Sequence, residues 1–153
     1  MYFVDRNQIE NNLIYIEELR QVFQSNTLTD SEVGKLALER ITHGFIEAFI
    51  DVGNQMIDGF IMRDPGSYED ILDILNDEKV IPENEAESFK EVIRLRKDLV
   101  SSYTKIDHHH FQQVLEKNIE VVHAFPGHVR SYLEKELGPV SAFLPENENK
   151  EGK

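Results

Sequence analysis

The sequence lacks cysteine and tryptophan, and it is poor in basic residues. Without cysteine, neither a disulfide nor a thiolate metal site can form. The 16 Lys and Arg residues are outnumbered by 29 Asp and Glu residues, which gives a formal net charge of −13. The chain as a whole therefore does not attract nucleic acid at long range, and any contact with a polyanion must be local.

Long apolar runs are missing as well. The first residues, MYFVDRNQIENN, lack the basic and then apolar pattern of a signal peptide, and no run of about 18 apolar residues could cross a membrane. The hydrophobic content of 40% is nevertheless enough for one buried core. We expect a soluble, cytoplasmic protein whose single domain covers residues 1–138, followed by a polar, disordered tail over residues 139–153.

Helical periodicity dominates the rest of the sequence. Apolar residues recur at three- and four-residue steps, as they do on the buried face of an α-helix, and no segment alternates with the period of a strand. Two such stripes are Ile9, Leu13, Ile16, Leu19 and Phe23, and Leu38, Ile41, Phe45, Ala48, Val52 and Ile57. We therefore predict an all-α fold, an antiparallel bundle of four to five long helices.

Local signals predict where these helices begin and end. Capping residues three positions apart predict helix starts; the pairs are Asp5 with Gln8, Thr29 with Glu32, and Ser67 with Asp70, and Asp107 can cap the last helix. Pro126-Gly127 is expected to break or kink that last helix. Glycine costs about 1 kcal/mol in a helix relative to alanine, so we expect close helix contacts at some of the glycines of the second helix, Gly34, Gly44 and Gly53.

One stretch of the chain is clearly basic, with five bases and two acids in residues 90–105. It overlaps the segment RLRKDLVSSYTKIDHHH, in which Arg96 and Tyr103 are seven residues apart. That spacing predicts that both side chains lie on the inward stripe of one helix, together with Ile93 and Val100. The plainer interpretation of the charge is a solvated helix face without a partner.

An arginine on an apolar face must be paired or lie at a groove between helices. Arg96 could be structural, bonded to Glu47 or Asp51 of the second helix. Alternatively, its planar guanidinium could bind a phosphate group, for which its geometry is well suited. We predict that Glu47 or Asp51 anchors Arg96 when no ligand is bound.

Glu39, His43, Glu47 and Asp51 follow one another at four-residue steps and so share one ridge of the second helix. Di-metal carboxylate bundles use this spacing, but they need matching Glu-x-x-His motifs on other helices, and residues 120–123 provide only one. A solvated or arginine-paired ridge is the favoured interpretation, with no metal and no other cofactor. A helical-bundle metal protein using His43 with Glu39 and Glu47 is the weaker alternative.

Three consecutive histidines, His108, His109 and His110, follow the cap at Asp107. Neighbouring residues of a helix point about 100° apart, so three in a row cannot converge on one metal ion. We expect them to form an exposed first helical turn, and the sequence assigns them no role.

The segment RLRKDLVSSYTKID resembles the signature of the HepT-like family of the HEPN superfamily. That family carries arginine, four residues, histidine, one residue and tyrosine, usually in a string such as Arg-Asn-x-x-Val-His-x-Tyr-x-x-Ile-Asp. The matching residues here are Arg96, Val100, Tyr103, Ile106 and Asp107. The segment ERITHGFIEAFIDVGNQMI also resembles the second helix of the family, and the resemblance extends over roughly residues 1–137. Two positions depart from the family: Lys97 replaces the asparagine, and Ser101 replaces the histidine.

The resemblance implies a HEPN-type bundle and a metal-independent endoribonuclease whose site is built from two protomers of a homodimer. In that family arginine steadies the phosphate charge and histidine moves a proton during RNA cleavage. Arg96 and Ser101 therefore occupy the catalytic positions, but a serine hydroxyl cannot transfer a proton near pH 7. Cleavage is expected to be weak or lost. Glu47, Asp51 and Lys97 are expected to be supporting polar residues.

The resemblance also implies a partner, a minimal nucleotidyltransferase antitoxin that modifies the family's tyrosine with AMP. Tyr103 is the corresponding candidate. We interpret the chain as a HepT-like component of a toxin–antitoxin system. The alternative is a non-catalytic dimeric module that binds RNA or a nucleotidyltransferase; Ser101 favours this alternative, whereas Arg96 and Tyr103 indicate that the binding site persists.

Overall fold

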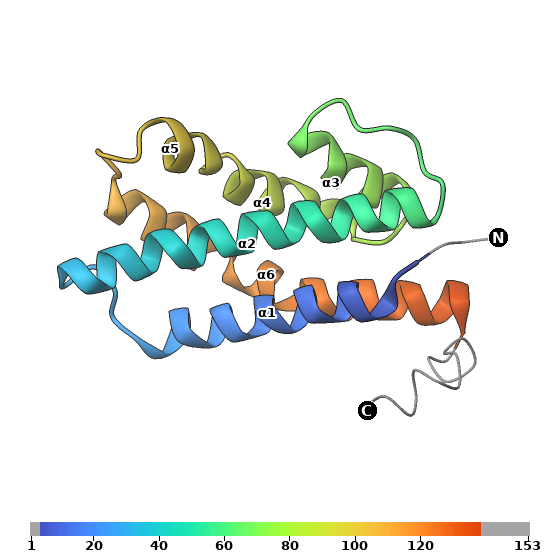
Figure 1. The fold of residues 1–153 in the computed structure, drawn as a ribbon, viewed down its shortest axis with the longest axis horizontal. Helices are drawn as coiled ribbons and strands as arrows, with labels where there is room; N and C mark the ends of the chain where they lie inside the picture. Colours follow the sequence, from blue (N-terminus) through green and yellow to red (C-terminus); the bar gives the residue numbers. More distant parts are fainter. Residues whose placement is uncertain (1–3, 139–153) are drawn as a thin grey trace.

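The computed structural model describes residues 4–138, which form α-helices joined by short loops (Figure 1). The helices are α1 Arg6–Ser25, α2 Glu32–Gly59, α3 Tyr68–Asp77, α4 Glu83–Ile93, α5 Arg96–Ser101 and α6 His108–Leu137. Residues 4–138 contain no strand, and the prediction of an all-α fold is confirmed. The tail expected at residues 139–153 lies outside the described residues. Across the described part of the chain, no helix is both long enough and apolar enough to cross a membrane.

The three longest helices form one side of the bundle. Helices α1 and α2 run side by side in opposite directions, and α6 lies against both of them (Figure 1). Helices α3 and α4 pair with each other and cover α2 and α6. Arg6 Nη1 donates a hydrogen bond to the carbonyl oxygen of Gly138 at 3.0 Å. The start of α1 and the end of α6 therefore meet at the same end of the molecule.

Most of the predicted helix starts are correct. The side chains of Asp5, Ser67 and Asp107 accept hydrogen bonds from backbone N–H groups three residues further on, as N-caps do. The predicted cap at Thr29 is wrong, because Ser31 caps α2 instead. Leu28 is buried, and the chain turns at residues 29–30 before the helix begins.

Four phenylalanines from three helices form the centre of the core. Phe45 stacks with Phe49 on α2, and Phe49 meets Phe89 of α4 and Phe125 of α6; all four side chains are fully buried. The Phe49 ring lies 5.2 Å from the Phe89 ring and 5.0 Å from the Phe125 ring, both edge to face. The Phe89 and Phe125 rings are 5.1 Å apart in the same arrangement. Such contacts add to the stabilisation from burying the rings themselves.

Helix α6 runs through Pro126 without ending there. Of the predicted break or kink, the break is wrong and the kink stays a prediction. Proline removes only one helical hydrogen bond, and its neighbours remain held by the core. Phe125 and Val129 are buried on either side of it. A single continuous helix therefore extends from the loop after α5 to the end of the described chain.

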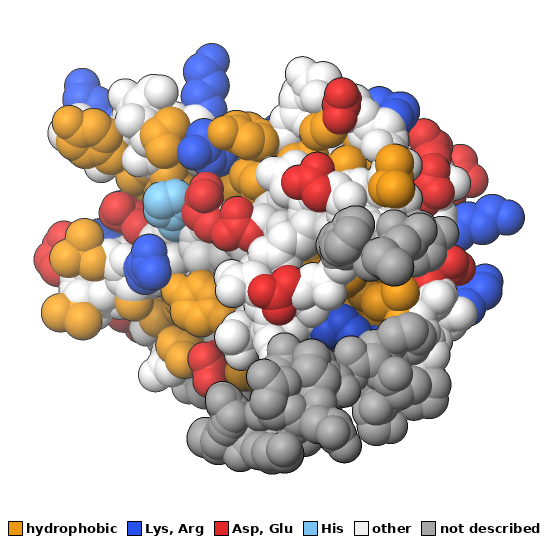
Figure 2. Space-filling model, turned by 45° about the vertical axis from the view of Figure 1, so that its right-hand side comes forward, with side chains coloured by type: hydrophobic (Ala, Val, Ile, Leu, Met, Phe, Trp, Pro, Cys, Tyr) orange, Lys and Arg blue, Asp and Glu red, His pale blue; other side chains and the backbone are white. Residues whose placement is uncertain are grey.

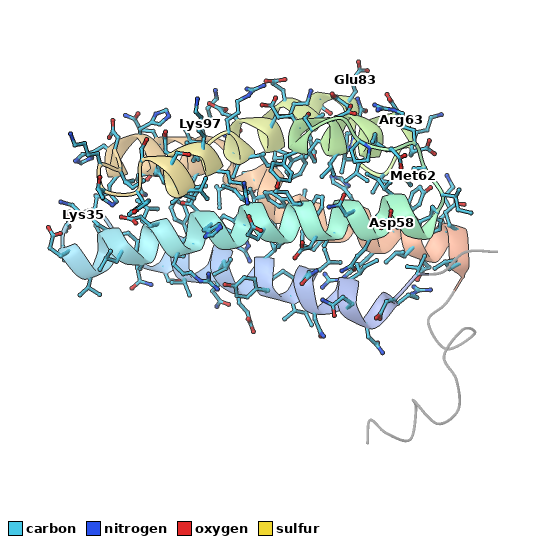
Figure 3. All side chains as sticks on the ribbon, turned by 45° about the horizontal axis from the view of Figure 1, so that its top comes forward. Lys35, Asp58, Met62, Arg63, Glu83 and Lys97 are labelled. Carbon is cyan, nitrogen blue, oxygen red and sulfur yellow. The ribbon has the colours of Figure 1, made fainter. Side chains whose placement is uncertain are left out.

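The loop between α2 and α3 is fastened by one arginine. Arg63 donates two hydrogen bonds to Asp70, at 2.7 and 2.9 Å, and the backbone N–H of Gly66 donates a third at 2.8 Å. The Arg63 guanidinium and the Gly66 N–H lower the pKa of Asp70 to about 2. Figure 3 shows Arg63 near the C-terminal end of α2, away from Lys97 on α5.

The glycines of α2 lie where other parts of the chain approach it most closely. A Cβ atom on Gly53 would collide with Ile71 of α3, and one on Gly44 would collide with Leu19 of α1. A Cβ on Gly34 would collide with the backbone carbonyl of Leu28. The expectation of close contacts at these glycines is confirmed.

We predict that Gly53→Ala destabilises the protein by about 1–3 kcal/mol, because the added methyl group overpacks the contact with Ile71. Gly127→Ala is the matched control, since a Cβ there meets no atom within 4 Å. It should stabilise the protein by up to about 1 kcal/mol through the higher helix propensity of alanine. Chemical denaturation measures both changes, and equal effects of the two variants would contradict the close α2–α3 contact.

Candidate functional site

The basic stretch of the sequence does not form one helix. The chain turns at Arg94 and Leu95 between α4 and α5, and α5 ends at Ser101. The predicted inward stripe is therefore wrong beyond α4: Val100 is 46% exposed and Tyr103 is 67% exposed. A seven-residue spacing keeps two side chains on one face only when the helix between them is uninterrupted and continues past both. The burial of Leu95 accompanies the turn.

Arg96 stands at the first turn of α5 and is held by two other helices. Its Nε donates a hydrogen bond to Oε2 of Glu47 on α2 at 3.0 Å. Its Cζ lies 4.7 Å from the centre of the Tyr68 ring at the start of α3, a cation–π distance. The predicted anchor is thus Glu47, and no hydrogen bond or ion pair links Arg96 to Asp51 within residues 4–138.

The terminal nitrogens of Arg96 remain free of the described part of the chain. Its hydrogen bond to Glu47 uses Nε, and Nη1 and Nη2 have no hydrogen-bond partner among residues 4–138. The side chain is 30% exposed, so these donors are accessible from solvent. Two parallel N–H groups of this kind match the oxygens of a phosphate or a carboxylate.

The polar ridge of α2 lies against α5 and the start of α6. His43 Nε2 is 3.4 Å from Glu47 Oε2, the same oxygen that Arg96 binds. One turn earlier, Glu39 Oε2 is hydrogen-bonded to His108 Nε2 at 2.6 Å. Figure 2 shows a histidine surrounded by acidic and basic side chains on the visible face. The ridge expected from the four-residue steps is present and carries two histidine–carboxylate pairs.

The histidines after Asp107 differ from one another. His109 and His110 are exposed, as expected for a first helical turn. The prediction is wrong for His108, whose side chain is only 19% exposed because it faces α2 and bonds Glu39. Capping at Asp107 fixes the first turn of α6 in this orientation.

Asp51 ends the ridge beside Glu47. Partial loss of hydration, and then repulsion from the Glu47 carboxylate, raise the pKa of Asp51. No hydrogen bond or ion pair to the described residues offsets this effect. Within residues 4–138, Glu47 is thus the acid that holds Arg96.

The other residues singled out in the sequence lie around Arg96 without bonding it. Lys97 is exposed and projects from α5 (Figure 3). Ser101 is the exposed last residue of α5, and Tyr103 follows in the turn. The structure thus brings together Arg96 and Glu47, and it adds His43 and Tyr68, which sequence reasoning did not connect with Arg96. For His43, the four-residue step to Glu47 was the available signal.

The histidines and carboxylates form separate pairs. His43 faces Glu47, whereas His108 faces Glu39. Within residues 4–138, no group of three or more histidines and carboxylates is arranged to hold a metal ion. The geometry of the ridge offers acid–base groups and an anchored arginine to a ligand.

Comparison with known proteins gives consistent similarities. A model of the family described as "Ribonuclease HepT-like" matches residues 9–129. A protein of Bacillus subtilis strain 168 named "Putative RNase YutE" is 52% identical over 143 residues, which are 94% of this chain and 99% of that protein. The solved structure of YutE, described as a cytosolic protein of unknown function, has a TM-score of 0.90 to this chain. The matched region comprises 94% of this chain and 100% of the YutE chain.

More distant similarity lies among toxins. The tri-AMPylated HEPN toxin of Shewanella oneidensis, solved in complex with an MNT antitoxin, has a TM-score of 0.71. The two sequences are 17% identical, and the matched region comprises 80% of this chain and 96% of the toxin chain. At this level of identity the likeness shows the fold, a HEPN-type helical bundle.

Proposed function

The chain belongs to the HepT-like ribonuclease family, and on that premise we propose that it is the HEPN component of a toxin–antitoxin system and binds RNA at Arg96. Its cleavage of RNA is weak or lost because Ser101 stands at the histidine position of the family motif. The observation that carries this proposal is Arg96, anchored by Glu47 and Tyr68 with its terminal nitrogens open to solvent. A cytosolic location, as described for the relative YutE, fits an RNA ligand.

Arg96 suits an RNA phosphate for physical reasons. The Glu47 hydrogen bond and the Tyr68 ring restrict its side chain, so less rotational freedom is lost when a ligand binds. Nη1 and Nη2 can donate two parallel hydrogen bonds to phosphate oxygens. These contacts fix the backbone of a nucleic acid without reading its bases. Recognition at this site would therefore depend on backbone geometry more than on base sequence.

Ser101 contributes little to chemistry in this proposal. A serine hydroxyl neither accepts nor releases a proton readily near neutral pH, whereas an imidazole does both. Arg96 would still stabilise negative charge on a phosphate in the transition state. The motif of α5 alone therefore supports binding and charge stabilisation without proton transfer. The second candidate function, a non-catalytic dimeric module that binds RNA or a nucleotidyltransferase, follows from the same observation at Ser101.

We also propose a homodimer and a nucleotidyltransferase antitoxin as partners. In a two-fold dimer the same surface meets itself, so the Arg96 residues of two protomers could share one cleft. Tyr103 is 67% exposed, and its hydroxyl is accessible for modification with AMP. The tri-AMPylated toxin of Shewanella oneidensis in complex with its antitoxin supports this assignment by analogy of fold.

The first prediction at this site concerns RNA affinity. Arg96→Ala should weaken binding of a short fluorescent RNA by about 10- to 100-fold, since hydrogen bonds to charged groups contribute about 1.5–3 kcal/mol. Arg94→Ala is the matched control: it removes the same charge nearby, but Arg94 is already bonded to Glu69 and Glu87. Fluorescence anisotropy measures both affinities. Equal losses would show that the effect is one of net charge rather than of this site.

The partner proposal is tested with Tyr103. Incubation with ATP and a minimal nucleotidyltransferase should add AMP to the wild-type protein. Tyr103→Phe should remove that addition, because phenylalanine has no hydroxyl to modify, whereas Tyr68→Phe should leave it. Mass spectrometry reads both results, and light scattering on the same samples gives the oligomeric state. A monomer, or AMP addition that persists in Tyr103→Phe, would exclude the corresponding partner proposal.

A separate prediction concerns the missing histidine. Ser101→His should raise RNA cleavage by about 10²–10⁴-fold, the usual value of general acid–base catalysis. Arg96→Ala should abolish this gain, and Ser101→Ala should leave the wild-type rate unchanged. The measurement is gel analysis of a labelled RNA in the presence of EDTA, which excludes stray metal at His108, His109 and His110. Without a gain from Ser101→His, position 101 would not be the catalytic position.

A further inference from the structure

His43 brings an imidazole to Arg96 from a different helix. Its Nε2 lies 3.4 Å from Glu47 Oε2, the atom that accepts the Arg96 hydrogen bond at 3.0 Å. The His43 imidazole and the Arg96 guanidinium therefore contact one carboxylate oxygen. The His43 side chain is 36% exposed, and its Nδ1 makes no hydrogen bond to the described part of the chain. One ring nitrogen thus faces Glu47, and the other is open to a ligand.

We infer that His43 supplies the proton transfer that Ser101 cannot provide, and that the weak RNA cleavage of this protein passes through His43 and Arg96. This inference rests on the proposed binding of an RNA phosphate at Arg96. His43 is then a catalytic residue, and Glu47 is the positioning residue that holds both of them.

Glu47 brings the Arg96 guanidinium and the His43 imidazole to one place. Carboxylate and phosphate oxygens make the same hydrogen bonds to a guanidinium group. A phosphate bound to the terminal nitrogens of Arg96 would lie on the solvent side of the guanidinium, beside the exposed imidazole of His43. A carboxylate next to an imidazole also stabilises the imidazolium that forms when the ring accepts a proton. The site therefore combines a charge stabiliser, a proton acceptor and an acid that orients them.

The reaction would be an internal transfer within the RNA chain. The ribose 2′-oxygen forms a bond to the adjacent phosphorus, and the bond from phosphorus to the 5′-oxygen of the next nucleotide breaks. His43 accepts the proton of the 2′-hydroxyl, and a water molecule gives a proton to the leaving 5′-oxygen. The resulting hydroxide takes the proton from the imidazolium, so the products are a 2′,3′-cyclic phosphate and a 5′-hydroxyl end.

The charged groups around His43 favour it over the other histidine of the ridge. Glu39 and Glu47 flank it on α2, Arg96 approaches from α5, and His108 faces Glu39 from α6. His108 is 19% exposed and is hydrogen-bonded to Glu39 at 2.6 Å. Its partner Glu39 lies two helical turns from Glu47, so His108 is further from Arg96 than His43 is.

The experiment compares His43→Gln, His43→Asn, His108→Gln and the exposed control His109→Gln with the wild-type protein. Each is tested for binding and for cleavage of one labelled RNA in EDTA. The wild type should cleave slowly, with a rate that rises as the pH is raised, because only a neutral imidazole can accept the proton. Both His43 variants should lose at least about 100-fold of that rate and its pH dependence. Their RNA affinity and thermal unfolding should match those of His109→Gln.

Three outcomes would overturn the inference. Wild-type protein that binds RNA through Arg96 but leaves it uncleaved has no proton transfer to assign, and the binding function stands alone. Cleavage that is lost in His108→Gln and retained in both His43 variants would assign the proton transfer to His108 and not to His43. Cleavage that ends in products other than the 2′,3′-cyclic phosphate contradicts the internal transfer. By contrast, RNA affinity that is insensitive to Arg96→Ala would contradict the proposed function itself.

Discussion

Burial of α2 on nearly all sides is the constraint from which the rest of the structure follows. This helix contacts every other helix of the described chain, and its phenylalanines form the centre of the core. Between Ile41 and Gly53 the residues that are not buried are His43, Glu47 and Asp51. A helix packed in this way can present polar groups along one ridge alone. The chemistry that α2 offers is therefore confined to a single line, which α5 and the start of α6 approach.

Sequence periodicity was sufficient to predict the fold because it reports directly on burial. The stripes from Ile9 to Phe23 and from Leu38 to Ile57 are buried as expected, and three of the four predicted caps are correct. The turn between α4 and α5 was missed because it contains neither glycine nor proline. The pairing of Arg96 with Glu47 could be expected because a partly buried arginine needs an acid. The contacts of Arg96 with Tyr68, and of His108 with Glu39, depend on how distant segments meet, which no local pattern records.

Three other arginines are bonded more fully to acids than Arg96 is. Arg130 of α6 donates four hydrogen bonds to Glu10 and Glu17 of α1, and these bonds lower the pKa of Glu17. Arg94 is bonded to two acids, and Arg63 makes two bonds to one acid. Each of these arginines joins two parts of the fold. Arg96 makes one hydrogen bond within residues 4–138, through Nε, so its terminal nitrogens remain available to a ligand.

The placing of a single accessible arginine on an acidic protein determines how ionic strength would act on a polyanionic ligand. With a net charge of −13, the protein repels such a ligand at a distance, and added salt screens that repulsion and speeds the encounter. Once in contact, the ligand binds the terminal nitrogens of Arg96, and salt weakens this short-range attraction less than it weakens the long-range field. Association would thus be slow in dilute buffer and faster at moderate ionic strength, the reverse of the behaviour of basic nucleic-acid-binding proteins.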